Sequence, residues 1–148
     1  MPDSQLYTRE AALAKATEIK TALAVSKLRF TKEGTVLTQF TTKAAMILVE
    51  ADYDGYVAGG IALAAWTGPA TDAQGGATLT SPLVNAAYGP AGAPAVTNSI
   101  GGWWVEDASG DVRVVGNFNP ARPMLEVGDF ITMAVQIVEA RNPSAPAV

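Results

Sequence analysis

The chain has 148 residues and a formal net charge of −4; 49% of the residues are hydrophobic and 16% are charged. It contains neither cysteine nor histidine, which excludes disulfides, thiolate nucleophiles and any acid, base or metal ligand that needs an imidazole. The charged fraction lies below the roughly 25% of typical soluble domains, which favours a protein that packs against other chains. A sequence pI of about 4.7, with no basic patch interleaved with aromatics, argues against a nucleic-acid partner.

The length suits a single domain, which we expect to span residues 1–148 as a helix over 8–25, a β-rich body over 27–138 and a loose tail over 139–148. No run of about 18 apolar residues predicts a membrane span, and the first ten residues, MPDSQLYTRE, lack the layout of a secretory signal. We therefore expect the protein to be made in the cytoplasm and to have no membrane partner.

Residues 8–25, TREAALAKATEIKTALAV, predict a helix that Thr8 caps, with Glu10 in the first turn, where a carboxylate favours the helix dipole. An alanine-rich helix of this length needs a surface to pack on, either in its own domain or in another subunit. Its modest apolar stripe comprises Leu13, Ala16, Ala24 and either Ile19 or Leu23. The first 43 residues carry a charge of +3 and the rest −7. Leu13 on the stripe and Lys20 among the basic residues are candidates for a subunit contact; the alternative is a solvated helix face, since the basic residues are spread rather than clustered.

Short strands and turns are predicted after the helix. Residues 27–31 alternate, with Leu28 and Phe30 on one side. Residues 46–49 fit either a buried strand or a short helix, and Asp54-Gly55 is strong turn chemistry.

From residue 57 to residue 102, nine glycines and four prolines punctuate the chain, with candidate strands over 61–66 and 77–88. Short strands between such breakers are typical of an all-β sandwich or barrel. The clearest pattern follows: residues 99–118 predict a hairpin with its turn at 107–111, where a late glycine supplies the left-handed residue of a bulged turn.

A last long strand is predicted after a turn at Gly128-Asp129. Strand alternation places two sets of side chains on opposite faces. One set is Ile131, Met133, Val135 and Ile137, and the other is Thr132, Ala134, Gln136 and Val138. The fold class we expect is mainly β, a sandwich or barrel with one N-terminal α-helix.

Two adjacent tryptophans, Trp103 and Trp104, lie in the first strand of the predicted hairpin. Successive side chains on a strand point to opposite faces, so one tryptophan fills the core and the other faces out of it. The outer ring packs under the helix or at a subunit contact. Alternatively, both faces of the strand are covered within one subunit, by a second sheet on one side and by the helix on the other. Both residues are candidates for an interface, where aromatic side chains are enriched.

Catalytic chemistry is not indicated. The acidic cluster around Asp52 and Asp54 starts like a calcium loop, but Ile61 occupies the position of the bidentate glutamate, so these acids are interpreted as turn residues. Glu106, Asp107 and Asp111 likewise fit a solvated turn better than a cation site. The paired glycines precede no Lys-Ser/Thr pair and form no phosphate-binding motif. We expect no enzyme, no cofactor and no metal.

Three stretches, TTKAAMILVEADYDGYVAGGIALAAWTGP, VTNSIGGWWVEDASGDVRVVGNF and PMLEVGDFITMAVQIV, together resemble a class of small structural proteins of tailed-bacteriophage virions. In that class a segment ending in acidic residues and GY leads into a strand, and a GG(Y/W) hairpin and a GD turn into the final strand follow. The resemblance covers roughly residues 8–138. This chain departs from it at residues 46–49, where an acidic, more polar stretch is common.

The resemblance implies a capsid-decorating or cementing protein with a jelly-roll-like sandwich. Such a protein binds the major capsid protein on the outer surface of the virion and forms a dimer or trimer there. Two alternatives remain: a tail or neck component of a phage, and a β-sandwich that binds carbohydrate by stacking it on an exposed aromatic face.

Overall fold

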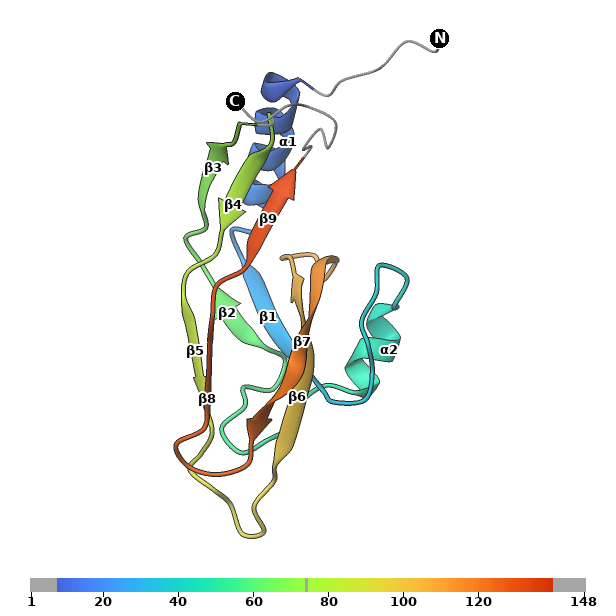
Figure 1. The fold of residues 1–148 in the computed structure, drawn as a ribbon, viewed down its shortest axis with the longest axis vertical. Coiled ribbons are helices and arrows are strands. Elements are labelled where there is room, and N and C mark those ends of the chain that lie inside the picture. The colour runs from blue at the N-terminus through green and yellow to red at the C-terminus, as the bar shows by residue number, and fades with distance from the viewer. Residues whose placement is uncertain (1–7, 74, 140–148) are drawn as a thin grey trace.

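The computed structural model describes residues 8–73 and 75–139, and the chain is mainly β with one main helix, as the sequence predicts (Figure 1). In chain order the elements are α1 (Arg9–Ala22), β1 (Ser26–Lys32), α2 (Lys43–Leu48), β2 (Ile61–Leu63), β3 (Thr67–Thr71), β4 (Ala77–Thr80), β5 (Val84–Ala87), β6 (Asn98–Glu106), β7 (Val112–Met124), β8 (Phe130–Met133) and β9 (Gln136–Glu139). The described strands form open antiparallel sheets in the orders β2-β1-β6-β7, β3-β4-β9 and β5-β8. Apart from residue 139, the tail predicted over 139–148 lies outside the described residues.

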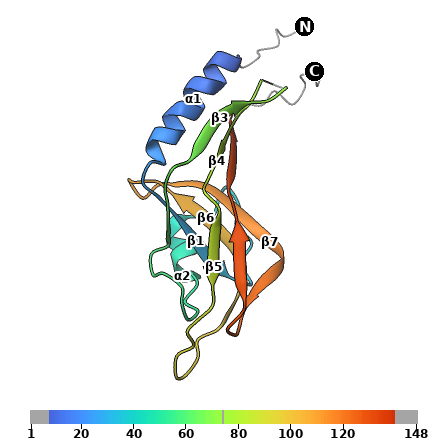
Figure 2. The same cartoon turned by 90° about the vertical axis from the view of Figure 1, so that its left-hand side faces the viewer.

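The first helix begins where the sequence predicts and ends earlier. Thr8 is the N-cap, and its Oγ1 accepts a hydrogen bond from the Ala11 N–H (3.1 Å). Because α1 ends at Ala22, Ala24 is exposed and does not belong to the apolar stripe, whereas Leu23 at the C-cap is buried. The helix packs on the β3-β4-β9 sheet at one end of the molecule (Figure 2).

The predicted hairpin is confirmed as β6 and β7. Its turn is closed by hydrogen bonds from the Asp107 N–H to the Asp111 carbonyl and from the Gly110 N–H to the Asp107 carbonyl, both 2.9 Å. Gly110 has φ +83°, the left-handed conformation that favours glycine. The Asp107 carboxylate accepts the N–H groups of Ser109 (2.9 Å) and Asp111 (3.1 Å). These contacts agree with the interpretation of the acidic residues here as part of a turn.

The predicted turn at Asp54-Gly55 is also confirmed. The Asp54 carboxylate accepts the N–H groups of Gly92 (2.7 Å) and Val96 (3.0 Å), and these hydrogen bonds lower its pKa. Gly55 has φ +94°, and a Cβ there would lie 2.6 Å from the carbonyl oxygen of Gly89. The turn therefore ties two loops at one end of the molecule together through backbone groups and leaves no room for a side chain.

The last predicted strand keeps its alternation but not its continuity. Residues 130–139 divide into β8, which pairs with β5, and β9, which pairs with β4. Between these pairs, Ser81 donates its N–H to the Val135 carbonyl (2.8 Å), and two residues, Pro82 and Leu83, stand opposite Ala134 alone. This is a β-bulge at a proline, which has no N–H to continue the ladder. Residues 77–87 and 130–139 thus form one bent antiparallel pair of segments, which we call the ribbon.

The main core lies between the β5-β8 half of the ribbon and the four-stranded sheet. Leu28, Phe30 and Ile100 of the sheet pack in one buried cluster with Val84 and Ile131 of the ribbon. The same cluster continues under α1 at the β4-β9 half. The ribbon therefore joins the two halves of the molecule, covered by the helix along one half and by the four-stranded sheet along the other (Figure 2).

Candidate interaction surface

Both tryptophans of β6 are covered within the chain. Trp104 is fully buried in a second, smaller core cluster with Leu37 and Met46. Trp103 is half-buried against the main core, and its ring lies over Gly116 of β7, where a Cβ would be 2.3 Å from a ring carbon. Strand alternation is therefore confirmed. The cover of the outer ring is α2 and the segment before it, not the N-terminal helix.

The four interface candidates from the sequence are placed as follows. Trp104 is buried inside the chain and so offers no surface to another subunit, which corrects that prediction. Leu13 is half-buried against the main core. Lys20 donates from Nζ to the Gly68 carbonyl of β3 (2.8 Å), which caps an edge-strand group. Trp103 keeps only part of its ring exposed. These residues mainly hold the chain's own elements together.

The cover over Trp104 is a projection that we call the arm, residues 33–50. Its two ends are joined: the Lys32 N–H donates to the Val49 carbonyl (2.8 Å), and the Ala51 N–H donates to the Phe30 carbonyl (2.9 Å). Near the start of the arm, Leu37 and Asn117 of β7 make two reciprocal hydrogen bonds of 2.8 Å between the Leu37 backbone and the Asn117 amide. The arm is thus attached to the sheet at its base and at Leu37.

The helix of the arm resolves the ambiguous stretch at residues 46–49. Thr42 is the N-cap of α2, and its Oγ1 accepts the Ala45 N–H (3.2 Å). One turn of helix then points Met46 onto Trp104 and leaves Ile47 and Leu48 exposed. The Thr-Thr-Lys-Ala-Ala run, a cap followed by good helix formers, is the signal in the sequence that favours a helix over a strand here.

A charged network beside Trp104 holds the arm to the sheet. Arg29 of β1 donates to Glu50 at the end of the arm and to Glu106 of β6 (3.2 and 3.3 Å), and its guanidinium lies 5.0 Å from the Trp104 ring centroid. Lys43 at the start of α2 pairs with Glu106 (3.2 Å), and the Trp104 Nε1–H donates to the same carboxylate (3.4 Å). Lys43 at the start of α2 is therefore held directly to Glu106 of β6. Glu50 at the end of the arm is held to the sheet through Arg29 of β1, which also contacts Glu106.

The electrostatics of the network follow from these contacts. The hydrogen bond from Arg29 to Glu50 raises the pKa of Arg29 above its ordinary value. Burial raises the pKa of Glu106, but the hydrogen bonds from Lys43 and Trp104 and the two positive charges outweigh it, so that pKa is lowered. Arg29 and Glu106 therefore both stay charged at neutral pH, and the ion pair between them weakens when Glu106 is protonated in acid.

The outer side of the arm exposes large apolar side chains. Phe40 is 82% exposed, Leu48 87% and Val36 75%, whereas Leu37 and Met46 on the inner side are buried. Scattered exposed apolar residues are ordinary, but several on one short, fixed projection are typical of an interaction site. The sequence pattern did not indicate these residues: Leu48 lies in a six-residue helix, which is too short to show a helical period, and Val36 and Phe40 precede it in a segment without helix or strand.

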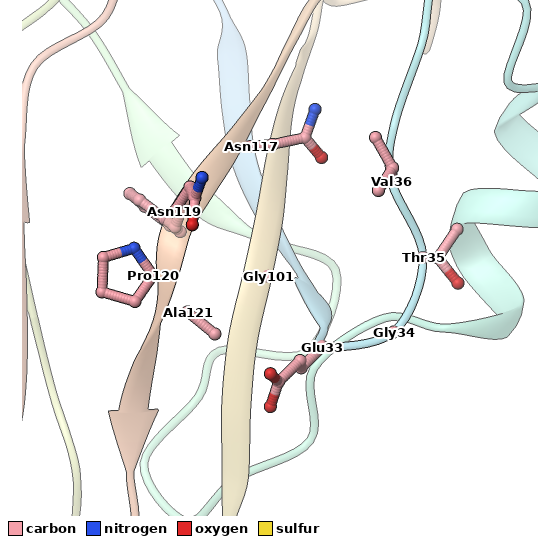
Figure 3. Close-up of a pocket in the computed structure, with 10 residues that line it drawn as sticks. Glu33, Gly34, Thr35, Val36, Gly101, Asn117, Asn119, Pro120 and Ala121 are labelled. Atoms are coloured by element: carbon pink, nitrogen blue, oxygen red, sulfur yellow. The ribbon is translucent and has the colours of Figure 1, made fainter.

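A groove of about 580 Å³ lies beside the arm, between residues 33–36 and β7 (Figure 3). It opens because Ile100 pairs with Arg122 and Gly102 pairs with Asn117, so that residues 118–121 of β7 stand opposite Gly101 alone. A Cβ on Gly101 would lie 2.9 Å from the Cα of Glu33, so only glycine permits the arm to start this close to β6.

The groove presents mixed chemistry. Val36, Pro120 and Ala121 give apolar walls, and Glu33 and Asn119 give polar ones. Its volume falls within the range of small-molecule sites, about 300–1,000 Å³. The groove and the exposed side of the arm share Val36, so they form one continuous candidate surface.

Among residues 8–73 and 75–139, no group of three or more acidic side chains could hold a metal ion. The same residues contain no helix with the length and apolar character needed to cross a membrane. No protein-family model, curated protein or solved structure matches the chain.

Proposed function

We propose that the chain is a non-enzymatic virion structural protein that binds and stabilises a bacteriophage capsid, as a decoration or cement protein. The partner is the major capsid protein, on the outer surface of the shell. One observation of the molecule supports the proposal more than any other: Val36, Phe40 and Leu48 project from an arm that is held to a β body by backbone hydrogen bonds and by a charged network centred on Glu106. The resemblance in sequence supplies the choice of partner.

A fixed arm suits this role energetically. Burying a leucine or phenylalanine side chain in an interface contributes about 1.5–3 kcal/mol. That gain is kept only when the contacting segment is ordered before binding, because ordering a loop on association costs free energy. The hydrogen bonds from Leu37 to Asn117 and from Lys32 to Val49 have already ordered the arm in the free chain.

Co-sedimentation with capsids assembled from the major capsid protein of the phage that encodes the chain tests the proposal. The wild type is compared with Phe40→Ala/Leu48→Ala and with a control, Leu125→Ala/Val127→Ala, which removes exposed apolar side chains at the turn before β8. We expect saturable binding of wild type and control at a fixed ratio to capsid subunits. The arm variant should bind roughly a hundredfold more weakly, since two side chains account for about 3 kcal/mol.

Two outcomes contradict the proposal. Absence of wild-type binding to both compact and expanded shells would favour a tail or neck component. If Phe40→Ala/Leu48→Ala binds capsids as tightly as the wild type, the arm is not the capsid-binding surface. Carbohydrate stacking gains little support from the tryptophans, since Trp66 and Trp104 are buried and Trp103 is half-buried; the exposed aromatic rings of the described chain are Phe40 and Phe130. Its test is quenching of tryptophan fluorescence by added glycans.

We also propose that the β body is a divergent jelly-roll-like sandwich. The support is that the β5-β8 pair and the β2-β1-β6-β7 sheet pack across one shared core. A jelly roll has eight strands in two Greek keys. An experimental structure of the assembled protein, in which strand pairing at the open edges of these sheets can be traced, tests this assignment.

A further inference from the structure

A second cleft, of about 240 Å³, lies between β7 and β8. Strand β7 contributes Phe118 and Arg122 to its walls, and β8 contributes Phe130, Ile131 and Thr132. The cleft is smaller than typical small-molecule sites, about 300–1,000 Å³, and suits a few side chains of one chain segment better. It shares no residue with the arm, so substitutions in the arm leave its walls intact.

The two strands that form this cleft are open edges of their sheets. Among the described strands, β7 pairs only with β6 and β8 pairs only with β5. The cleft contacts three successive residues of β8: Phe130 and Thr132 are exposed on one face, and Ile131 is buried on the other. Because successive side chains alternate between faces, a cleft that contacts all three lies along the edge of β8. Such an edge can accept an extended segment as an additional strand.

Arg122 supplies the charge of the cleft. Its guanidinium lies 5.6 Å from the Phe118 ring centroid, and this cation–π contact holds it beside the ring. Within the part of the chain that the structure describes, its side chain makes no hydrogen bond and no ion pair. The other described arginines, Arg9, Arg29 and Arg113, each donate at least one hydrogen bond. Arg122 is therefore the described arginine that still needs an acceptor.

A guanidinium stacked on a ring is well suited to a carboxylate. Stacking uses its flat face and leaves the N–H donors of its rim free, and these match the two oxygens of a carboxylate in a bidentate pair. The chain has 14 acidic residues, yet none of those described contacts Arg122. The positive charge is thus left for an acid outside the described chain.

We propose that this cleft binds an extended segment of a partner protein, which pairs along the edge of β8 and places an aspartate or glutamate carboxylate on Arg122. An apolar side chain of the same segment packs against Phe130, which is 63% exposed in the free chain, and against Phe118. The Thr132 hydroxyl donates to Asn85 Oδ1 (3.3 Å), and its oxygen can still accept an N–H of the segment. A free anion would use the guanidinium but neither the open edge nor the apolar walls, so a protein segment is the better match.

Selection from a random octapeptide library on the purified chain tests this proposal. We expect the selected peptides to be enriched in aspartate or glutamate next to an apolar residue. One selected peptide and its counterpart with the acid replaced by the amide are then titrated by fluorescence anisotropy. The chains compared are the wild type, Arg122→Gln and a control, Lys27→Gln, which removes an exposed charge of β1; each variant changes the net charge from −4 to −5.

The expected result is that Arg122→Gln weakens binding of the acidic peptide at least tenfold and that Lys27→Gln does not. The amide peptide should bind wild type as weakly as the acidic peptide binds Arg122→Gln, and combining the two changes should cost little more, because both remove the same ion pair. Arg122→Lys should restore only part of the affinity, since an ammonium neither stacks nor forms a bidentate pair. Circular dichroism checks that each variant is folded.

NMR locates the bound peptide without any variant. The acidic peptide should shift the backbone resonances of residues 118–122 and 130–132 and the Arg122 side-chain Nε–H, and should leave those of α1 unchanged. Selected peptides without enriched acids, equal affinity for Arg122→Gln, shifts confined to the arm, or tighter binding of inorganic phosphate than of the peptide would each overturn the proposal. No capsid is used, so failure of the capsid proposal leaves these results unchanged.

Discussion

Replacing Glu106 by glutamine removes the charge that joins β6 to both Arg29 and Lys43. The side chain is 9% exposed and receives hydrogen bonds from Arg29, Lys43 and Trp104, at 3.2 to 3.4 Å. Loss of one partner of a buried ion pair costs about 3–5 kcal/mol, but Arg29 keeps Glu50 and Lys43 is more than a third exposed. We therefore expect Glu106→Gln to reduce the free energy of unfolding by about 2 kcal/mol.

The pH dependence of this loss has a definite sign. The pKa of Glu106 is lowered in the folded chain, so its charge stabilises the fold above the unfolded value, near 4.3, and the contribution is lost as the pH falls through the folded-state pKa. Glutamine does not titrate. The difference in stability between wild type and Glu106→Gln should therefore be full at pH 7 and shrink below about pH 4.

Urea unfolding followed by tryptophan fluorescence measures this difference, because Trp104 lies in the network. At pH 7 the variant should melt roughly 4–8 °C lower in a parallel thermal scan. Glu126→Gln, an exposed position, is the control and should change stability by less than about 0.5 kcal/mol. A Glu106→Gln variant as stable as the wild type at pH 7, or a difference of the same size at pH 3, would refute the electrostatic clamp.

Three further substitutions test other parts of the structure. Gly116→Ala places a Cβ against the Trp103 ring and should cost about 2 kcal/mol in urea unfolding; an unchanged midpoint would contradict the packing. Asn117→Ala removes both hydrogen bonds to Leu37 and should speed proteolytic cleavage within the arm about tenfold, which the Asn119→Ala control should not. Thr8→Ala removes the cap of α1 and should cost about 1 kcal/mol by thermal unfolding, with Thr17→Ala as the exposed comparison.

Local chemistry in the sequence was sufficient to predict the turns and the first helix. A threonine before an alanine-rich run predicted the N-cap of α1. Gly110 and Gly128 predicted two of the turns, and the structure shows both glycines at positive φ. The hairpin was predictable because alternation on both strands and a short acidic turn agree with one another. Each of these features depends on residues that are close in sequence.

Long-range pairing explains where the predictions stop. Nothing within residues 130–139 shows that the strand divides, because the cause is Pro82, about fifty residues earlier, which cannot donate to the ladder. Likewise, alternation predicts that one of the two tryptophans faces outward but does not say which. The structure shows that it is Trp104, and its cover comes from residues 37–46, which are far from it in the sequence. The groove beside Gly101 depends on a register shift between β6 and β7 that the glycine alone does not specify.

The candidate surface was the least predictable part. The interface candidates taken from the sequence were large or charged residues, and the structure uses Trp104 and Lys20 within the chain. The residues that remain exposed, Phe40 and Leu48, carry no signal of their own. Their exposure follows only once Leu37 and Met46 are known to occupy the inner side of the arm.

Hydroxyl-radical footprinting of the capsid-bound protein tests the central claim most directly, because it reports which side chains lose contact with water. The account predicts that Val36, Phe40 and Leu48 are modified several-fold more slowly on capsids than in the free protein at the same concentration. Leu125 and Val127, which are 50% and 72% exposed in the free chain, should react at unchanged rates. Unchanged modification of the arm, with protection elsewhere or nowhere, would contradict the claim that the arm is the capsid-binding surface.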